Sequence, residues 1–173
     1  GNYDCYLPTI VNQVKFNKPF LSNEFKINQN ISSKPIKVTI PGPLTITDTI
    51  ADNYYNDSKK LGIDLSVAIN NEIKDLANAG CKYIQIDEPL FARKTEEAIS
   101  FGIENLERCF HGLSNEVEKI VHICCGYPDK IDAIDYPKAP LNSYNDLAYY
   151  LEDSSVNTIS IEDAHRHNDL KLL

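Results

Sequence analysis

The stretch that decides the fold runs from Leu61 to Leu90 and reads LGIDLSVAINNEIKDLANAGCKYIQIDEPL. Its first part spaces apolar residues three and four apart, which predicts an amphipathic helix over residues 57–79 with Gly80 as its C-terminal stop. The second part, residues 83–86, is a short apolar strand that ends at Asp87. A helix that leads into such a strand is one unit of a parallel α/β fold.

The same alternation continues on both sides of this stretch. Residues 1–33 are polar and interrupted by prolines, which predicts an irregular lead-in with one short helix at most. Residues 1–173 are expected to form a single partial domain, in which residues 34–173 are repeated strand and helix units, because strands and helices alternate along them. The expected strands are 36–40, 120–124 and 158–161, and the further helices are 94–113 and 144–153. The first of these strands is expected to stop at a rigid turn formed by Pro41, Gly42 and Pro43.

Each expected strand ends in residues that are able to bind or catalyse, and catalytic groups gather at the carboxyl ends of parallel strands in barrels and open sheets alike. An open doubly wound sheet would commonly carry a glycine-rich phosphate loop after its first strand, and this sequence has none. The pattern therefore favours an α/β fold of the (β/α)8 TIM-barrel type. A whole barrel takes about 250 residues, so 173 residues hold about four or five of its eight units. The expected fold is an incomplete barrel.

Composition excludes two classes of partner. The chain has 17 basic and 25 acidic side chains and a net charge of −8, which disfavours nucleic acid. Its apolar runs fall short of the roughly 20 residues that span a membrane. Five irregularly spaced cysteines, in a chain large enough to build a core without disulfides, predict either reduced thiols in a cytoplasmic protein or metal ligands.

His122 and Cys124 are two residues apart on an expected strand, so their side chains share one face and form a candidate metal pair. Glu162, after the next strand, is the nearest further donor. Cys125 is a reserve ligand whose side chain is expected to face away from the Cys124 site. The alternative is that His122 is a hydrogen-bonded core residue and Cys124 a small buried one.

Asp87 and Glu88 place two carboxylates at one strand end, pointing in different directions. One of them is suited to bind a substrate ammonium while the other holds the loop. The alternative is that they cap the following turn or helix. Residues 162–167 are dense in ionisable groups, which fits acid–base catalysts or anion binders as well as a solvated helix start with His165 and His167 exposed.

Taken together, the strand ends resemble the cobalamin-independent methionine synthase family, within the superfamily that also holds uroporphyrinogen decarboxylase. The resemblance implies a (β/α)8 barrel whose zinc ion is held by His122, Cys124, Glu162 and a second cysteine beyond Leu173. It also implies a 5-methyltetrahydropteroyltriglutamate–homocysteine S-methyltransferase, in which zinc activates the homocysteine thiol and methionine is formed. Asp87 matches an aspartate that helps to bind the substrate amino group, and Glu88 is expected to support it. The segments that carry the resemblance are 37–45, 84–89, 121–124 and 160–162.

The resemblance leaves the methyl donor and the acceptor open. Folate-using members carry a tryptophan where this chain has Thr49, and the chain contains no Trp. The alternatives are alkyl transfer to another thiol such as coenzyme M, and a non-catalytic barrel fragment that self-associates as a homo-oligomer through its open edges. Small-molecule substrates are the expected partners in the first two cases.

Overall fold

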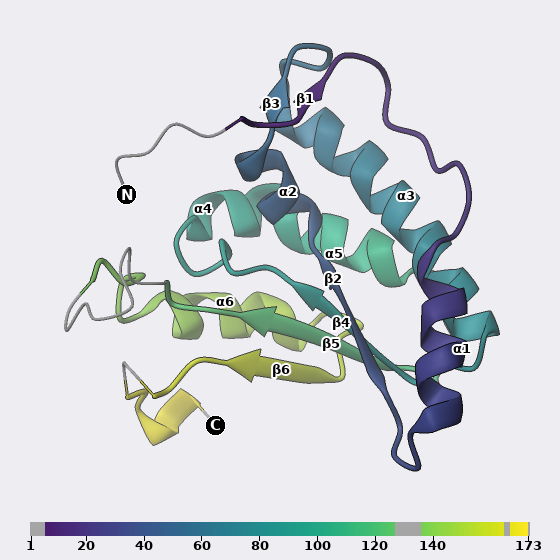
Figure 1. Cartoon of the computed structure of the whole chain (residues 1–173). Helices are drawn as coiled ribbons and strands as arrows, with labels where there is room; N and C mark the ends of the chain where they lie inside the picture. The colour runs from purple at the N-terminus through teal and green to yellow at the C-terminus, as the bar shows by residue number, and fades with distance from the viewer. Residues whose placement is uncertain (1–5, 127–135, 165–166, 173) are drawn as a thin grey trace.

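The computed structural model describes residues 6–126, 136–164 and 167–172, and its main feature is a parallel four-stranded sheet. The strand order is β2-β4-β5-β6, so each strand pairs with the next one along the chain (Figure 1). A separate two-stranded parallel sheet joins β1 (Thr9–Ile10) to β3 (Ala51–Asp52). The four main strands are β2 (Lys37–Pro41), β4 (Tyr83–Asp87), β5 (Glu118–Ile123) and β6 (Thr158–Ile161).

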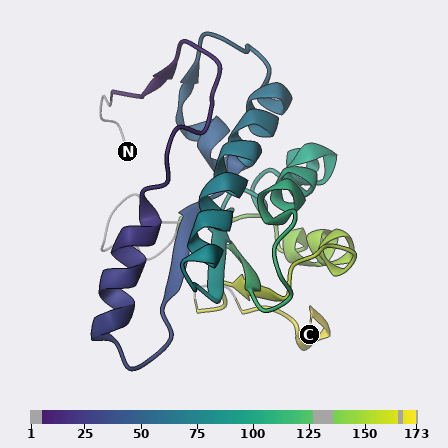
Figure 2. The same cartoon turned by 90° about the vertical axis from the view of Figure 1, so that its right-hand side faces the viewer.

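The helices α3, α5 and α6 lie on one side of the sheet, and α1 lies beside the edge strand β2 (Figures 1 and 2). The longest, α3, packs against α1, α2 and α5, and α6 lies beside the turns that precede α5. The helices are α1 (Leu21–Ile31), α2 (Pro43–Thr49), α3 (Ser58–Asn78), α4 (Thr95–Glu97), a π-helical turn (Ala98–Gly102), α5 (Ile103–Phe110), α6 (Ser143–Glu152) and a 3-10 turn (Leu170–Leu172).

Local sequence explains why α3 begins and ends where it does. The Asp57 side chain accepts hydrogen bonds from the backbone N–H groups of Lys59 and Lys60, which caps the first turn. At the other end, Gly80 has a φ of +98°, a left-handed conformation that glycine adopts without a steric penalty. The apolar stripe of the helix is buried in the core through Leu61, Leu65, Ile69, Ile73 and Leu76.

The two faces of the main sheet differ in chemistry. One face packs under the helices and supplies core residues from β2, β4 and β5, among them Ile40, Ile86 and Ile123, and Ile161 of β6 packs against that core. The other face carries polar residues in register, because Asp87 on β4 pairs with His122 on β5, which pairs with Ser160 on β6. A barrel strand alternates in this way between residues that face the helices and residues that face the interior.

The structure confirms the parallel α/β fold and most of the expected elements. The lead-in holds one helix, α1, and the strand β1, which the sequence did not predict. The turn expected after β2 is wrong, because the chain forms the helix α2 directly at Pro43, a residue whose fixed φ suits a first helical turn. The expected helix 94–113 is broken by a π-helical turn. Within the described residues the sheet is open, with β2 and β6 at its edges, so barrel closure stays a prediction.

No helix among the described residues is both long and apolar enough to cross a membrane. The described cysteines, Cys81, Cys109, Cys124 and Cys125, are all buried and unbridged, which fits the predicted reduced thiols.

Candidate functional site at the carboxyl ends of the strands

The carboxyl ends of β2, β4, β5 and β6 lie along one edge of the sheet, as parallel strands require. Backbone hydrogen bonds tie three of these ends together. Gly42 N donates to Asp87 O at 2.8 Å, and Glu88 N donates to His122 O at 2.9 Å. The segments that leave β2, β4 and β5 are therefore held in fixed relation to one another.

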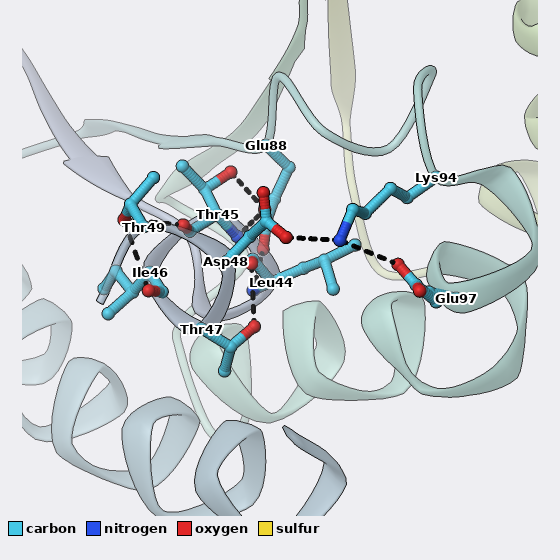
Figure 3. Close-up of polar contacts among 9 residues, drawn as sticks. All are labelled: Leu44, Thr45, Ile46, Thr47, Asp48, Thr49, Glu88, Lys94 and Glu97. Atoms are coloured by element: carbon cyan, nitrogen blue, oxygen red, sulfur yellow. Dashed lines mark hydrogen bonds and ion pairs between the residues drawn. The ribbon is translucent and has the colours of Figure 1, made fainter. Parts of the chain in front are cut away.

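Glu88 is fully buried and joins the end of β4 to the start of α2 (Figure 3). Its Oε1 accepts from Leu44 N at 2.9 Å, while its Oε2 accepts from Thr45 N at 2.9 Å and Thr45 Oγ1 at 2.8 Å. The N-cap residue of α2, Gly42, has no side chain to satisfy these groups, so Glu88 caps the helix from another strand. Both carboxylate oxygens thus face protein donors, which fits the predicted role of holding the loop.

Burial raises the pKa of Glu88 to about 7, with a smaller contribution from the charge of Asp87. The three hydrogen bonds from Leu44 and Thr45 act in the opposite direction, because they favour the ionised form. The loss of water is the larger effect. Glu88 is therefore poised to change its protonation state near neutral pH.

A second link between α2 and the segment after β4 runs through Lys94 (Figure 3). Its ammonium forms a hydrogen-bonded ion pair with Asp48 and a 3.5 Å ion pair with Glu97. The hydrogen bond with Asp48 is the main cause of a raised Lys94 pKa. The contacts of Glu88 and the Lys94–Asp48 ion pair therefore attach both ends of α2 to the segment that follows β4.

Asp87, the residue before Glu88, lies on the polar face of the sheet, away from the helices. The two adjacent carboxylates therefore do point in different directions, as the sequence predicted. Gln85 Nε2 donates to Asp87 Oδ1 at 2.6 Å. Asp87 is directly opposite His122 in the strand register, and His122 Nδ1 lies 3.1 Å from Ser160 Oγ.

The predicted metal ligands occupy neighbouring strands, but the structure does not bring them together as a group. His122 is on β5, Cys124 is buried just beyond it, and Glu162 follows β6. Gly126 N donates to Cys124 Sγ at 3.4 Å. Within residues 6–126, 136–164 and 167–172, no three His, Cys, Asp or Glu side chains are arranged to hold a metal ion.

Cys125 makes one contact that the sequence did not predict. Its Sγ donates to Glu162 Oε2 at 2.8 Å, so it touches a candidate ligand. Cys125 also belongs to the hydrophobic core cluster together with Ile123, whereas Cys124 does not, which fits the expectation that its side chain faces away from the Cys124 site. Among the other residues named from the sequence, His165 lies outside the described residues, and exposed His167 forms a 3.7 Å contact with Asp163.

Sequence reasoning missed two residues of the polar face, Gln85 and Lys37. Gln85 precedes Asp87 by two positions, so strand alternation alone would have placed it on the same face. Lys37 reaches this group only through the pairing of β2 with β4, which no local pattern reveals.

Comparison with known proteins identifies a family. Residues 3–172 match the family model described as "Cobalamin-independent synthase, Catalytic domain". Methionine synthase from Saccharolobus solfataricus is 38% identical over 120 residues, covering 69% of this chain and 35% of that protein. Methionine synthase from Sulfurisphaera tokodaii is 34% identical over 146 residues, covering 80% of this chain and 42% of that protein. The chain thus spans less than half the length of these curated relatives.

Solved structures agree with this assignment. A B12-independent methionine synthase from Shewanella sp. W3-18-1, solved in complex with selenomethionine, is 32% identical with a TM-score of 0.85. That match covers 98% of this chain and 50% of the other. A vitamin-B12-independent methionine synthase homologue from Listeria monocytogenes, 20% identical with a TM-score of 0.60, shares the fold over 67% of this chain and 40% of its own. The chain belongs to the cobalamin-independent methionine synthase family, within its catalytic domain.

Proposed function

We propose that this chain carries the amino-acid-binding and metal-binding strands of a methionine synthase-type methyltransferase. The reaction would move a methyl group to the sulfur of homocysteine and form methionine. The observation that carries the proposal is the pairing of Asp87 with His122 on adjacent strands, at the edge where parallel α/β enzymes place their sites.

Asp87 is suited to bind the substrate ammonium. Its carboxylate is half-buried and lies on the polar face of the sheet, where a charged hydrogen bond is stronger than in open water. The relative from Shewanella was solved with selenomethionine, an α-amino acid that carries such an ammonium. By the same reasoning, coenzyme M, which has a sulfonate and no amino group, would meet repulsion at Asp87.

The types of donor, though not their arrangement in the structure, fit the proposed zinc ion. Imidazole nitrogen, thiolate sulfur and carboxylate oxygen are the groups that zinc binds in proteins, and His122, Cys124 and Glu162 would supply them. The three residues lie on or just beyond two paired strands, β5 and β6. To take part, Glu162 would exchange its hydrogen bond with Cys125 for the metal. When bound, zinc would lower the pKa of the substrate thiol so that it ionises at neutral pH.

The chain's own contribution to transfer is orientation. A homocysteine held at Asp87 would have its thiol directed along the strand ends toward His122. As the new sulfur–carbon bond forms, the bond between the methyl carbon and its donor breaks, and the thiol proton is lost to solvent or to a base. Thr49 Oγ1 donates to Thr45 O at 2.9 Å, and its small side chain offers no surface on which a pterin could stack. We therefore name the donor only as a small molecule with a transferable methyl group.

Elemental analysis of the purified chain tests the metal proposal. We expect about one zinc ion per chain, lost in His122→Ala, Cys124→Ser and Glu162→Gln. The exposed His111, and the exposed Glu152 on α6, give matched controls, His111→Ala and Glu152→Gln, which should retain the metal. Absence of zinc in the wild type, or retention in all three site variants, would refute the metal site.

Calorimetric titration tests the substrate. We expect methionine and homocysteine to bind and coenzyme M not to bind. We expect Asp87→Asn to weaken the binding of the two amino acids only. Preference for coenzyme M would establish the alternative acceptor. A chain that binds none of these and elutes as an oligomer would establish the scaffold alternative.

A further inference from the structure

The polar face of the sheet carries a chain of three side chains that ends at Asp87. Lys37 lies on β2, and Gln85 and Asp87 lie on β4, two positions apart and therefore on the same face. In the register, Thr39 is opposite Gln85 and Lys37 is opposite Tyr83. The Lys37 side chain thus reaches Gln85 diagonally across the strand pair.

Two hydrogen bonds connect these side chains. Lys37 Nζ donates to Gln85 Oε1 at 2.5 Å, and Gln85 Nε2 donates to Asp87 Oδ1 at 2.6 Å. An ammonium can only donate and a carboxylate can only accept, so the amide between them satisfies both in a single orientation. Lys37 therefore determines which end of the Gln85 amide faces Asp87.

Gln85 is well placed to hold that orientation. It is only 7% exposed, so water competes weakly for its amide. Both of its partners carry formal charge, and charge-assisted hydrogen bonds are the stronger kind. Within the described part of the chain, no group donates to the second oxygen of Asp87, Oδ2. One carboxylate oxygen is thus fixed by the protein while the other is left for a ligand.

We propose that Gln85 is a positioning residue that aims the Asp87 carboxylate at the ammonium of the amino-acid substrate, and that Lys37 sets the direction of its amide. This inference rests on the proposed function. The direction is useful because Asp87 stands opposite His122, so an ammonium held at Asp87 leaves the rest of the substrate over the candidate metal ligands.

The test compares two probes that differ in the ammonium alone. Methionine carries it, and 4-(methylthio)butanoate has the same thioether, carbon chain and carboxylate without it. In Gln85→Leu and in Gln85→Glu, which loses the donor to Asp87, methionine affinity should fall about tenfold, the usual loss for a hydrogen bond to a charged group. Affinity for 4-(methylthio)butanoate should stay the same, which a merely structural role of Gln85 would not produce.

Two further variants complete the design. Lys37→Met should lower methionine affinity less than Gln85→Leu, because the amide keeps its bond to Asp87. Gln13 Nε2 donates to Asp64 at the surface. Gln13→Leu is therefore a matched control, and it should leave the affinity for both probes unchanged.

The possible outcomes separate this inference from the proposed function. Equal methionine affinity in wild type and Gln85→Leu, with loss in Asp87→Asn, would overturn the role of Gln85 and leave the proposed function standing. An equal loss of affinity for both probes would show that Gln85 has only a structural role. Failure of the wild type to bind methionine would overturn the proposed function, and this inference with it. An independent check is nuclear magnetic resonance of the Gln85 side-chain amide, whose protons should exchange slowly in wild type and faster in Lys37→Met; fast exchange in the wild type would refute the bridge itself.

Discussion

The Glu88 carboxylate lies so close to Gly42 that a Cβ atom at position 42 would stand 2.2 Å from Glu88 Cδ. Only glycine leaves room for this contact, in which a buried carboxylate from the end of β4 caps the helix that follows β2. The sequence motif Pro-Gly-Pro after β2 thus has a packing reason that is separate from any role in binding. Because Gly42 also donates to Asp87 O, the same contact positions the backbone of the candidate substrate-binding residue.

Gly42→Ala should destabilise the chain, because overpacking of a well-filled interior costs about 1–3 kcal/mol. The added methyl group would push on the Glu88 carboxylate and strain its bonds to α2. Urea unfolding of the single and double variants measures the effect. In the Glu88→Ala background the cost of Gly42→Ala should shrink, because the colliding atoms are gone. An unchanged cost in that background would contradict the contact.

Glu88 should make the stability of the chain fall as pH rises from about 4.5 to about 7. Its pKa in the folded state, about 7, is above the reference value of 4.5, so the folded state holds the proton more tightly than the unfolded state in this interval. The contribution of Glu88 to the free energy of unfolding is therefore greatest below about pH 4.5. It decreases by roughly 3 kcal/mol as the pH rises to about 7.

The Glu88→Gln variant isolates this contribution, because it cannot ionise. Denaturant unfolding at a series of pH values should give a difference between wild type and variant that changes between about pH 4.5 and pH 7 and is flat above. The variant also turns an amide N–H₂ group toward the donors of α2, so its stability should be lower at low pH. A pH-independent difference would show that Glu88 is ionised throughout.

Lys94→Met should have only a small effect on stability. The ion pairs with Asp48 and Glu97 are partly exposed, and such pairs contribute about 0.2–1 kcal/mol. The difference from wild type should decrease as salt is added. Lys60, which pairs with Asp57 and is more exposed, provides the control Lys60→Met with a still smaller effect. A salt-independent loss of several kcal/mol would mean that Lys94 acts through packing instead.

Cys109 should react far more slowly in the folded chain than in the unfolded chain. Burial raises its pKa well above the usual value, and the charge of Glu88 adds to the effect. The thiolate that reacts with alkylating reagents is therefore scarce at neutral pH. Pulse labelling followed by mass spectrometry of the peptides should find Cys109 modified only after denaturation. Rapid labelling under native conditions would contradict its buried position.

Much of the fold follows from local patterns in the sequence. Apolar steps of three and four predicted α3, and short β-branched runs predicted β2, β4, β5 and β6, because helix and strand periods are properties of neighbouring residues. The helix α2 was missed because a Pro-Gly-Pro segment has the composition of a turn, and the capping carboxylate that stabilises this helix lies 44 residues away.

The candidate site, like the fold, was predicted in part from local sequence and in part only by the tertiary structure. By itself, the sequence placed Asp87, His122 and Glu162 at or just beyond the ends of strands, and parallel order then brings those strand ends to one edge. Only the tertiary structure decided that Glu88 turns inward to α2, that Lys37 reaches Gln85 and that Cys125 contacts Glu162. The physical reason is that each of these contacts joins residues at least 37 positions apart, so they depend on strand order and register, and not on any local period.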